Sequence, residues 1–111
     1  MTGKRTIREI EQILRKIKLT LKEIYGDRLV EVILYGSFAR NTPTTDSDID
    51  IAIVLKGKVK KAKEIDKIYD AVYDLMLETG ELISVYPISE EEIGNSVWPL
   101  YFYIKTEGIR I

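Results

Sequence analysis

The segment from Ile49 to Leu55 constrains the fold most, because it is almost continuously apolar apart from Asp50 near its start. Such a run is typical of a central strand that is covered on both faces. A second run of aliphatic and β-branched residues, from Leu29 to Tyr35, precedes it and stops at Gly36-Ser37. The two runs predict strands of one sheet, packed beneath helices.

Helical periodicity surrounds these strands. Apolar residues recur at helical spacing from about residue 6 to residue 25, and again from Ala62 to Gly80. The remaining elements are expected in this order: a third strand from Leu82 to Ile88, a short helix that begins with a capping box at Ser89 and Glu92, a helix from Pro99 to Gly108, and a short edge strand at residues 109–111.

The connections between the strands predict a mixed sheet. The short connection between the first two strands favours an antiparallel pair, and the long helix before the third strand favours a parallel crossover. The end of the first strand and the starts of the next two then share one rim, which holds Gly36-Ser37, Asp48, Asp50 and the segment from Glu81 to Ser84. At 111 residues the chain is expected to form a single domain, residues 1–111.

The composition excludes several kinds of chemistry. The chain has no cysteine and no histidine, which removes thiol nucleophiles, disulfides, the usual zinc ligands and a histidine base. Its 17 basic and 18 acidic residues nearly cancel, so a nucleic-acid partner is not expected. No apolar stretch resembles a signal segment or a membrane span, which predicts a cytoplasmic protein without a membrane partner.

Two aspartates on one strand face predict a metal site. Asp48 and Asp50 are two residues apart, so their carboxylates point to the same side with Cα atoms about 6.6 Å apart. Two anions in so small a volume repel each other, which favours binding of a cation. Hard oxygen ligands suit Mg²⁺ or Mn²⁺, and either metal would bring the phosphates of a nucleotide with it.

The turn after the first strand predicts a phosphate site beside that metal. Gly36 lets a phosphate approach the backbone, Ser37 offers a hydroxyl and an amide where a helix would start, and Arg40 can add a charge-assisted contact. Each fragment alone is more often an ordinary turn or a solvated loop end. Their combination in register with the strands favours a metal-nucleotide site.

These residues resemble a known family. Gly36-Ser37-x-Ala39-Arg40 and Ser47-Asp48-Ile49-Asp50-Ile51 are similar to the motif of the minimal nucleotidyltransferases, small members of the DNA polymerase beta superfamily, several of which are antitoxins of HEPN-type toxins. The resemblance implies an α+β nucleotidyltransferase fold in which a small mixed sheet is covered by helices. It implies that Asp48 and Asp50 bind Mg²⁺ and that Gly36, Ser37, Arg40 and Ser47 form the nucleotide site.

The resemblance also implies an activity. Family members transfer a nucleoside monophosphate, here expected from ATP, to a hydroxyl and release pyrophosphate, and those of antitoxin type can place AMP on a tyrosine of a HEPN-type toxin partner. The recognised residues leave the nucleotide, the acceptor and the oligomeric state open.

One position departs from the family pattern. The usual third acid, in the next strand, is replaced by Ser84, which cannot act as a carboxylate base. Glu81 is a substitute on the same rim, although strand alternation places it on the other face unless the strand begins later or bulges. The rival interpretation is a catalytically weak or inactive nucleotide-binding antitoxin or regulatory subunit.

A lysine-rich run and a group of aromatic residues can each be interpreted in two ways. A lysine-rich run lies at the far end of the second strand and is expected to be a solvated turn rather than a phosphate clamp or a partner site; it comprises Lys56, Lys58, Lys60, Lys61 and Lys63. Most of the aromatic residues Trp98, Tyr101, Phe102 and Tyr103 are expected to complete the core rather than form an interface. An exposed Tyr101 or Tyr103 would permit self-modification.

Overall fold

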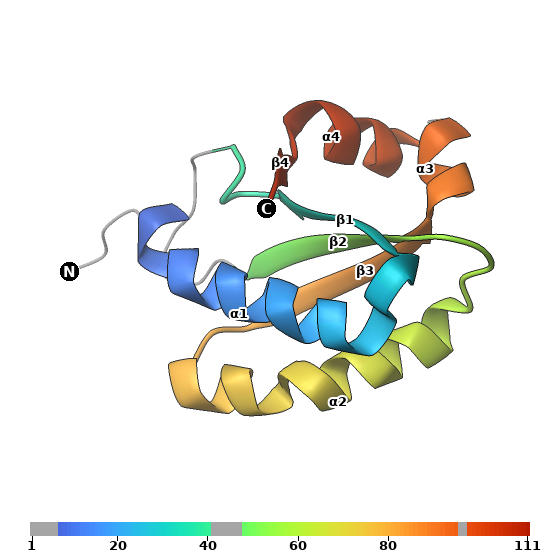
Figure 1. The fold of residues 1–111 in the computed structure, drawn as a ribbon. Helices are drawn as coiled ribbons and strands as arrows, with labels where there is room; N and C mark the ends of the chain where they lie inside the picture. Colours follow the sequence, from blue (N-terminus) through green and yellow to red (C-terminus); the bar gives the residue numbers. More distant parts are fainter. Residues whose placement is uncertain (1–6, 41–47, 96–97) are drawn as a thin grey trace.

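The sheet is mixed and has four strands in the order β3-β2-β1-β4 (Figure 1). The computed structural model describes residues 7–40, 48–95 and 98–111. The strands are β1 (Leu29–Tyr35), β2 (Ile49–Leu55), β3 (Ile83–Ser89) and β4 (Ile109–Arg110). β1 pairs antiparallel with β2 and with β4, whereas β2 pairs parallel with β3. The predicted mixed topology is therefore confirmed.

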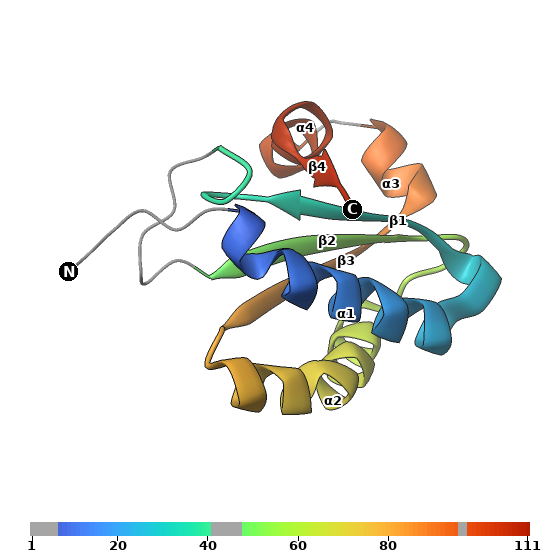
Figure 2. The same cartoon turned by 60° about the vertical axis from the view of Figure 1, so that its left-hand side comes forward.

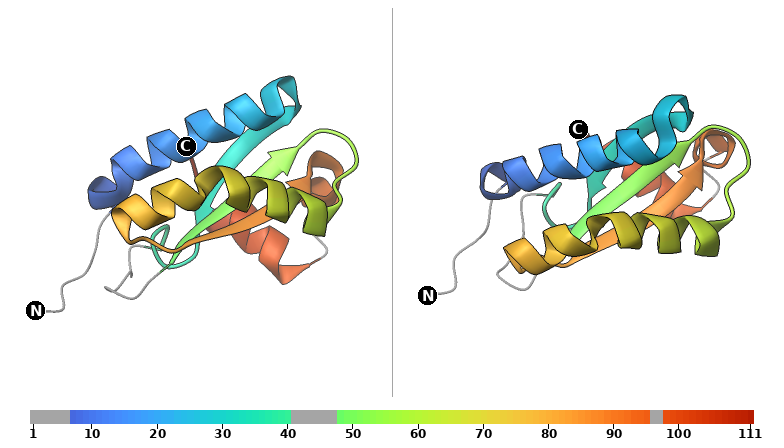
Figure 3. Two further views of the ribbon diagram at one scale, coloured as in Figure 1. Left: turned by 90° about the horizontal axis from the view of Figure 1, so that it is seen from below. Right: turned by 60° about the horizontal axis from the view of Figure 1, so that its bottom comes forward.

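Helices cover both faces of the sheet (Figure 2). α1 (Ile7–Tyr25) and α2 (Lys61–Thr79) lie on one face, and a 3-10 turn, η1 (Gly26–Arg28), joins α1 to β1. Figure 3 shows α1 and α2 lying side by side over that face. α3 (Glu90–Asn95) and α4 (Pro99–Glu107) cover the other face, and α4 begins beside Tyr86 of β3 and ends against Ile33 of β1.

The larger part of the core lies between the sheet and the α1/α2 pair. Strand alternation sends Val32, Leu34, Ile51 and Ile53 toward these helices, where all four are at most 1% exposed. The helices pack an aliphatic stripe against these strand residues; it includes Ile10, Leu14, Ile17, Leu21, Ile68 and Val72. This face holds only apolar side chains in its centre, which makes it the main source of hydrophobic stabilisation.

A smaller core lies between the sheet and the α3/α4 pair. It contains Ile33, Ala52, Val54, Ile88, Ile93, Tyr101 and Ile104, with Val30, Tyr35 and Tyr86 packed against it. A bulge in the β1–β2 pairing between Leu29 and Glu31 shifts the alternation and brings Val30 to this face. The same face carries Asp50 and Ser84, so apolar and polar groups share it.

The prediction for the C-terminal aromatic residues is wrong. Tyr101 is buried, but Trp98, Phe102 and Tyr103 are 65%, 53% and 50% exposed. α4 is nine residues long and lies on a narrow strip of sheet, so it buries only the stripe formed by Tyr101 and Ile104. The other aromatic residues of this segment therefore face outward.

Candidate functional site

Strand register brings the predicted site residues to one end of the sheet. Asp50 of β2 lies opposite Tyr35, the last residue of β1, and opposite Ser84 of β3. Gly36 follows directly on Tyr35, and Asp48 immediately precedes β2. The end of β1 and the starts of β2 and β3 therefore form the predicted common rim.

Gly36 packs directly against Asp50. Its φ of 75° lies in the left-handed region, and a Cβ placed on it would overlap the Asp50 carboxylate. Residues 36–40 form one turn, closed by a hydrogen bond of 3.1 Å from the Arg40 amide to the Gly36 carbonyl, and Phe38 anchors it in the core at 1% exposure. Ser37 therefore lies in a turn that spans residues 36–40 and not at the expected start of a helix.

Asp50 is held in a setting that disfavours its charge. Burial raises the pKa of the Asp50 carboxyl, the neighbouring Asp48 raises it further, and Arg40 lowers it by a smaller amount. Asp48 is exposed. The carboxylates of Asp48 and Asp50 repel each other, and that of Asp50 lies beside Gly36. Two such oxygen ligands suit a hard divalent cation such as Mg²⁺ or Mn²⁺. The residues therefore fit the metal that the motif implies.

Arg40 already has an anionic partner. Its Nε lies 3.4 Å from Oε2 of Glu107 at the end of α4, and both side chains are largely solvated, with 60% and 39% exposure. An ion pair of this exposure contributes only about 0–1 kcal/mol, so a phosphate could displace Glu107 at little cost. The structure thus connects the turn at the end of β1 to α4.

Ser84 is the residue that the sequence analysis matched to the third acid of the family. Ser84 lies opposite Asp50 in the parallel ladder, so a serine stands on the strand where the motif would supply an acid. Glu81 precedes β3, which starts at Ile83, so the alternation argument against it does not apply. The Ile49 amide donates to the Leu82 carbonyl at 2.8 Å, which places this connection beside Asp48.

No cluster of three acids forms among the residues that the structure describes. Asp48 and Asp50 are the two carboxylates that the motif contributes to the described rim. Ser47, predicted to belong to the nucleotide site, lies in the segment 41–47 outside the described ranges.

Tyr35 is a neighbour of the site that the motif does not identify. Burial raises the pKa of the Tyr35 hydroxyl to about 12, and the negative charge of Asp50 contributes. The antiparallel register, in which Tyr35 faces Asp50, was the available signal. A phenol with so high a pKa stays protonated at neutral pH, so Tyr35 can donate but not act as a base.

Lys61 forms a polar cluster farther along the same face. Its ammonium donates to the hydroxyls of Tyr86 and Tyr101 at 3.2 and 3.3 Å and lies 3.4 Å from the Glu92 carboxylate. Burial alone lowers the pKa of Lys61, but these hydrogen bonds and the charge of Glu92 raise it overall. Sequence reasoning placed Lys61 in a solvated turn and missed these contacts, because its partners are 25 to 40 positions away.

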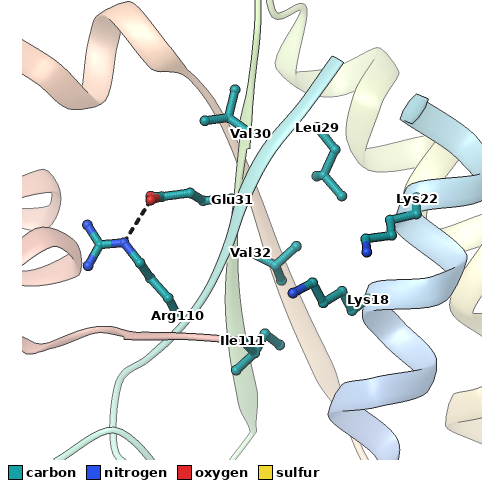
Figure 4. Close-up of a pocket in the computed structure, with 8 residues that line it drawn as sticks. All are labelled: Lys18, Lys22, Leu29, Val30, Glu31, Val32, Arg110 and Ile111. Atoms are coloured by element: carbon teal, nitrogen blue, oxygen red, sulfur yellow. Dashed lines mark hydrogen bonds and ion pairs between the residues drawn. The ribbon is translucent and has the colours of Figure 1, made fainter. Parts of the chain in front are cut away.

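A groove of about 330 Å³ lies away from the rim, beside the first half of β1 (Figure 4). Lys18 and Lys22 of α1 line one side, and an ion pair of 2.7 Å between Arg110 and Glu31 closes the other. Its lining includes none of the predicted site residues. The groove is therefore separate from the rim.

The sequence matches a family model and several named proteins. The family model described as "Nucleotidyltransferase domain" matches residues 14–109. The Methanocaldococcus jannaschii protein named "Putative protein adenylyltransferase MJ0604" is 33% identical over 88% of this chain and 93% of its own length. A second protein of that organism, "Putative protein adenylyltransferase MJ0126", is 34% identical over 90% of this chain and 99% of its own length.

A solved structure has the same fold. A chain from the crystal structure of the toxin-antitoxin MntA-HpeT, in a mutant form, superposes with a TM-score of 0.56 and 17% identity, covering 91% of this chain and 70% of that one. The likeness at this identity concerns the fold alone. In the part of this chain that the structure describes, no helix has the length and apolar character needed to cross a membrane.

Proposed function

Because this chain belongs to the nucleotidyltransferase domain family, we propose that it binds Mg²⁺-ATP and transfers AMP to a protein hydroxyl, with a tyrosine of a HEPN-type partner as the acceptor. One observation carries the proposal: the Gly36 turn packs on the Asp50 carboxylate, with Asp48 beside it. Relatives named as protein adenylyltransferases support ATP as the donor and a protein as the acceptor. The matched toxin-antitoxin chain supports a paired system.

In the proposed site, some residues of the rim bind the metal and others bind the triphosphate. Asp48 and Asp50 would hold Mg²⁺ or Mn²⁺, and Gly36, Ser37 and Arg40 would hold the triphosphate, with Ser47 as a further proposed contact. Bound there, the metal supplies charge neutralisation of the triphosphate and of the leaving pyrophosphate. Arg40 turns from Glu107 to the phosphates, exchanging one exposed anion for another.

The transfer itself is a displacement at the α-phosphorus. The acceptor oxygen forms a bond to that phosphorus, the bond to the pyrophosphate oxygen breaks, and the acceptor loses its hydroxyl proton. Glu81 is the proposed proton acceptor, because its segment is hydrogen-bonded to β2 beside Asp48. A positioned base contributes about a hundredfold to ten-thousandfold, so transfer would be slow without it.

The test uses ATP labelled at the α-phosphate. We expect label on protein when the chain, alone or with a HEPN-type toxin, is incubated with Mg²⁺ and this ATP. Asp48→Asn should abolish the label, whereas the matched control Asp70→Asn, an exposed aspartate of α2, should keep it. Asp48 is exposed, so its substitution leaves the fold intact. Equal labelling by both variants would contradict the assignment.

The second candidate function is a nucleotide-binding antitoxin or regulatory subunit without transfer. Ser84 opposite Asp50 is the observation that favours it. This candidate predicts Mg²⁺-dependent ATP binding with no label on either protein. It also predicts that Ser84→Asp, which restores a third carboxylate at this position, creates measurable transfer.

A further inference from the structure

The edge strand β4 leaves the first residues of β1 without a neighbour on their outer side. β4 pairs only with Ile33 and Leu34, and one further hydrogen bond of 2.9 Å runs from the Ile111 amide to the Val32 carbonyl. In the part of the chain that the structure describes, no strand lies beside Leu29–Glu31 on that side. An open strand edge of this kind offers backbone N–H and C=O groups to a strand from another chain.

The groove of about 330 Å³ follows this open edge (Figure 4). The strand residues from Leu29 to Val32 line one wall, and Lys18 and Lys22 of α1 line the other. Figure 4 shows the ammonium groups of both lysines pointing from α1 toward β1. A segment that pairs with the open edge therefore lies within reach of both lysines.

The groove has a positive charge that nothing in it compensates. Arg110 pairs with Glu31 at 2.7 Å, so these two charges neutralise each other. Lys18 and Lys22, by contrast, have no ion-pair or hydrogen-bond partner among the residues that the structure describes. An occupant that carries acidic groups would supply the missing partners.

The spacing of the two lysines matches that of an extended chain. Lys18 and Lys22 are four residues apart on α1, which separates them by about 6 Å along the helix axis. Every second residue of a strand points to the same face, at intervals of about 6.6 Å. Acidic residues two positions apart in an added strand would therefore reach both lysines from one face of the sheet.

The same charges argue against a second copy of this chain as the occupant. Two copies paired along this edge would each bring Lys18 and Lys22 to the interface, and like charges in close contact are unfavourable. The bulge in β1 between Leu29 and Glu31 increases the local twist, which restricts the edge to a short added segment. A short acidic segment of a different protein satisfies both conditions.

We propose that the open edge of β1 and the two lysines form a docking site for a short extended segment of a partner protein, with acidic residues at alternate positions. The backbone of the segment pairs with Leu29–Glu31, and its acidic side chains bind Lys18 and Lys22. In this mode of recognition the main-chain hydrogen bonds give affinity and the alternate side chains give specificity. The groove contains none of the rim residues, so the docking site does not depend on the proposed transfer reaction.

Peptide binding without nucleotide or metal tests the docking site. The probe is a fluorescein-labelled peptide of sequence Thr-Glu-Val-Glu-Val-Glu-Val-Thr, and its fluorescence anisotropy is measured as the chain is added. We expect saturable binding that weakens as salt is added, because Lys18 and Lys22 are partly solvated. The same peptide with lysine in place of each glutamate should not bind. Absence of binding by the acidic peptide, or equal binding by the lysine peptide, would overturn the proposal.

A matched pair of double variants locates the binding. Lys18→Gln with Lys22→Gln removes both charges from the groove, and we expect about tenfold weaker binding for two partly solvated ion pairs. Lys16→Gln with Lys63→Gln removes the same total charge from exposed positions outside the groove and should bind like the unmodified chain. Glutamine is a good helix former, so both variants keep α1 and α2. Equal affinities of the two double variants would overturn the site.

Methylation of the peptide backbone distinguishes strand pairing from attraction between charges alone. The acidic peptide with every backbone amide methylated keeps its charges but has no N–H group to donate to β1. We expect it to bind roughly tenfold more weakly than the parent peptide, because several main-chain hydrogen bonds are lost. If both peptides bind with the same affinity, the open edge of β1 does not pair with them and the proposal is overturned.

Discussion

The two faces of the sheet differ in what they bury. The face under α1 and α2 is filled by aliphatic side chains, most of them less than 5% exposed. The face under α3 and α4 combines a smaller apolar core with Asp50, Ser84, Tyr35 and the Lys61 cluster. The face under α1 and α2 stabilises the fold and takes no part in the proposed chemistry. The face under α3 and α4 can therefore carry charges that disfavour folding.

A matched pair of substitutions measures this difference. Ile53 and Ile33 are both at most 2% exposed and lie on the two central strands, Ile53 facing α1 and α2 and Ile33 facing α4. Ile→Ala in a core costs about 2–5 kcal/mol. We expect Ile53→Ala near the upper end and Ile33→Ala near the lower end, measured by urea unfolding. Equal losses, or the reverse order, would break the comparison.

Glu64 is a buried acid at the edge of the aliphatic face, and its role is structural. It is 5% exposed, accepts a hydrogen bond of 3.0 Å from the Tyr25 hydroxyl and pairs with Arg28 at 3.3 Å. Burial would raise the pKa of Glu64, but Tyr25, Arg28 and Lys67 lower it overall. We expect Glu64→Gln to cost about 1–3 kcal/mol at neutral pH, because Arg28 loses its anion.

The pH dependence of unfolding tests whether Glu64 has this structural role. Since the folded-state pKa of Glu64 is below the ordinary value of 4.5, its contribution is complete above that value and is lost as the pH falls through the lower folded-state pKa. Glu64→Gln should therefore flatten the loss of stability in acid. The exposed Glu78→Gln, on the same helix, should follow the unmodified chain. A profile unchanged by Glu64→Gln would exclude the structural role.

The smallest expected effect concerns the ion pair that joins the turn to α4. Glu107→Gln removes the anion that occupies Arg40, so we expect ATP to bind up to about fivefold more tightly, equivalent to the 0–1 kcal/mol of an exposed pair. Isothermal titration at low salt measures this change, with Glu78→Gln as the control. Weaker binding in Glu107→Gln would show that Glu107 orients Arg40 rather than competing for it.

The local pattern predicted most of the fold. β1 and β2 have the expected bounds, because both are short apolar runs with clear turn residues beyond them. β3 begins one residue later than expected, at Ile83; the Leu82 carbonyl still accepts a hydrogen bond from the Ile49 amide, but the Leu82 side chain is 67% exposed. The capping residue Ser89 is confirmed: it accepts from the Glu92 amide at 3.0 Å.

What the sequence did not predict depends on contacts between distant residues. The position of Lys61 follows from how α2 starts against β3 and α4, which no local pattern contains. The exposure of Trp98 follows from the narrow strip of sheet that α4 covers. Both features could therefore be found only in three dimensions.

The central claim is that Asp50 is kept for metal-nucleotide binding and not for stability. The most direct measurement is the melting temperature of the unmodified chain and of Asp50→Asn, each with and without Mg²⁺-ATP. Without ligand, Asp50→Asn should melt at the same temperature or a few degrees higher, because a repelled, partly buried charge is removed. At 100 times the dissociation constant, Mg²⁺-ATP should stabilise the unmodified chain by about 2.7 kcal/mol and the variant far less. Equal stabilisation of both proteins by Mg²⁺-ATP would contradict the claim.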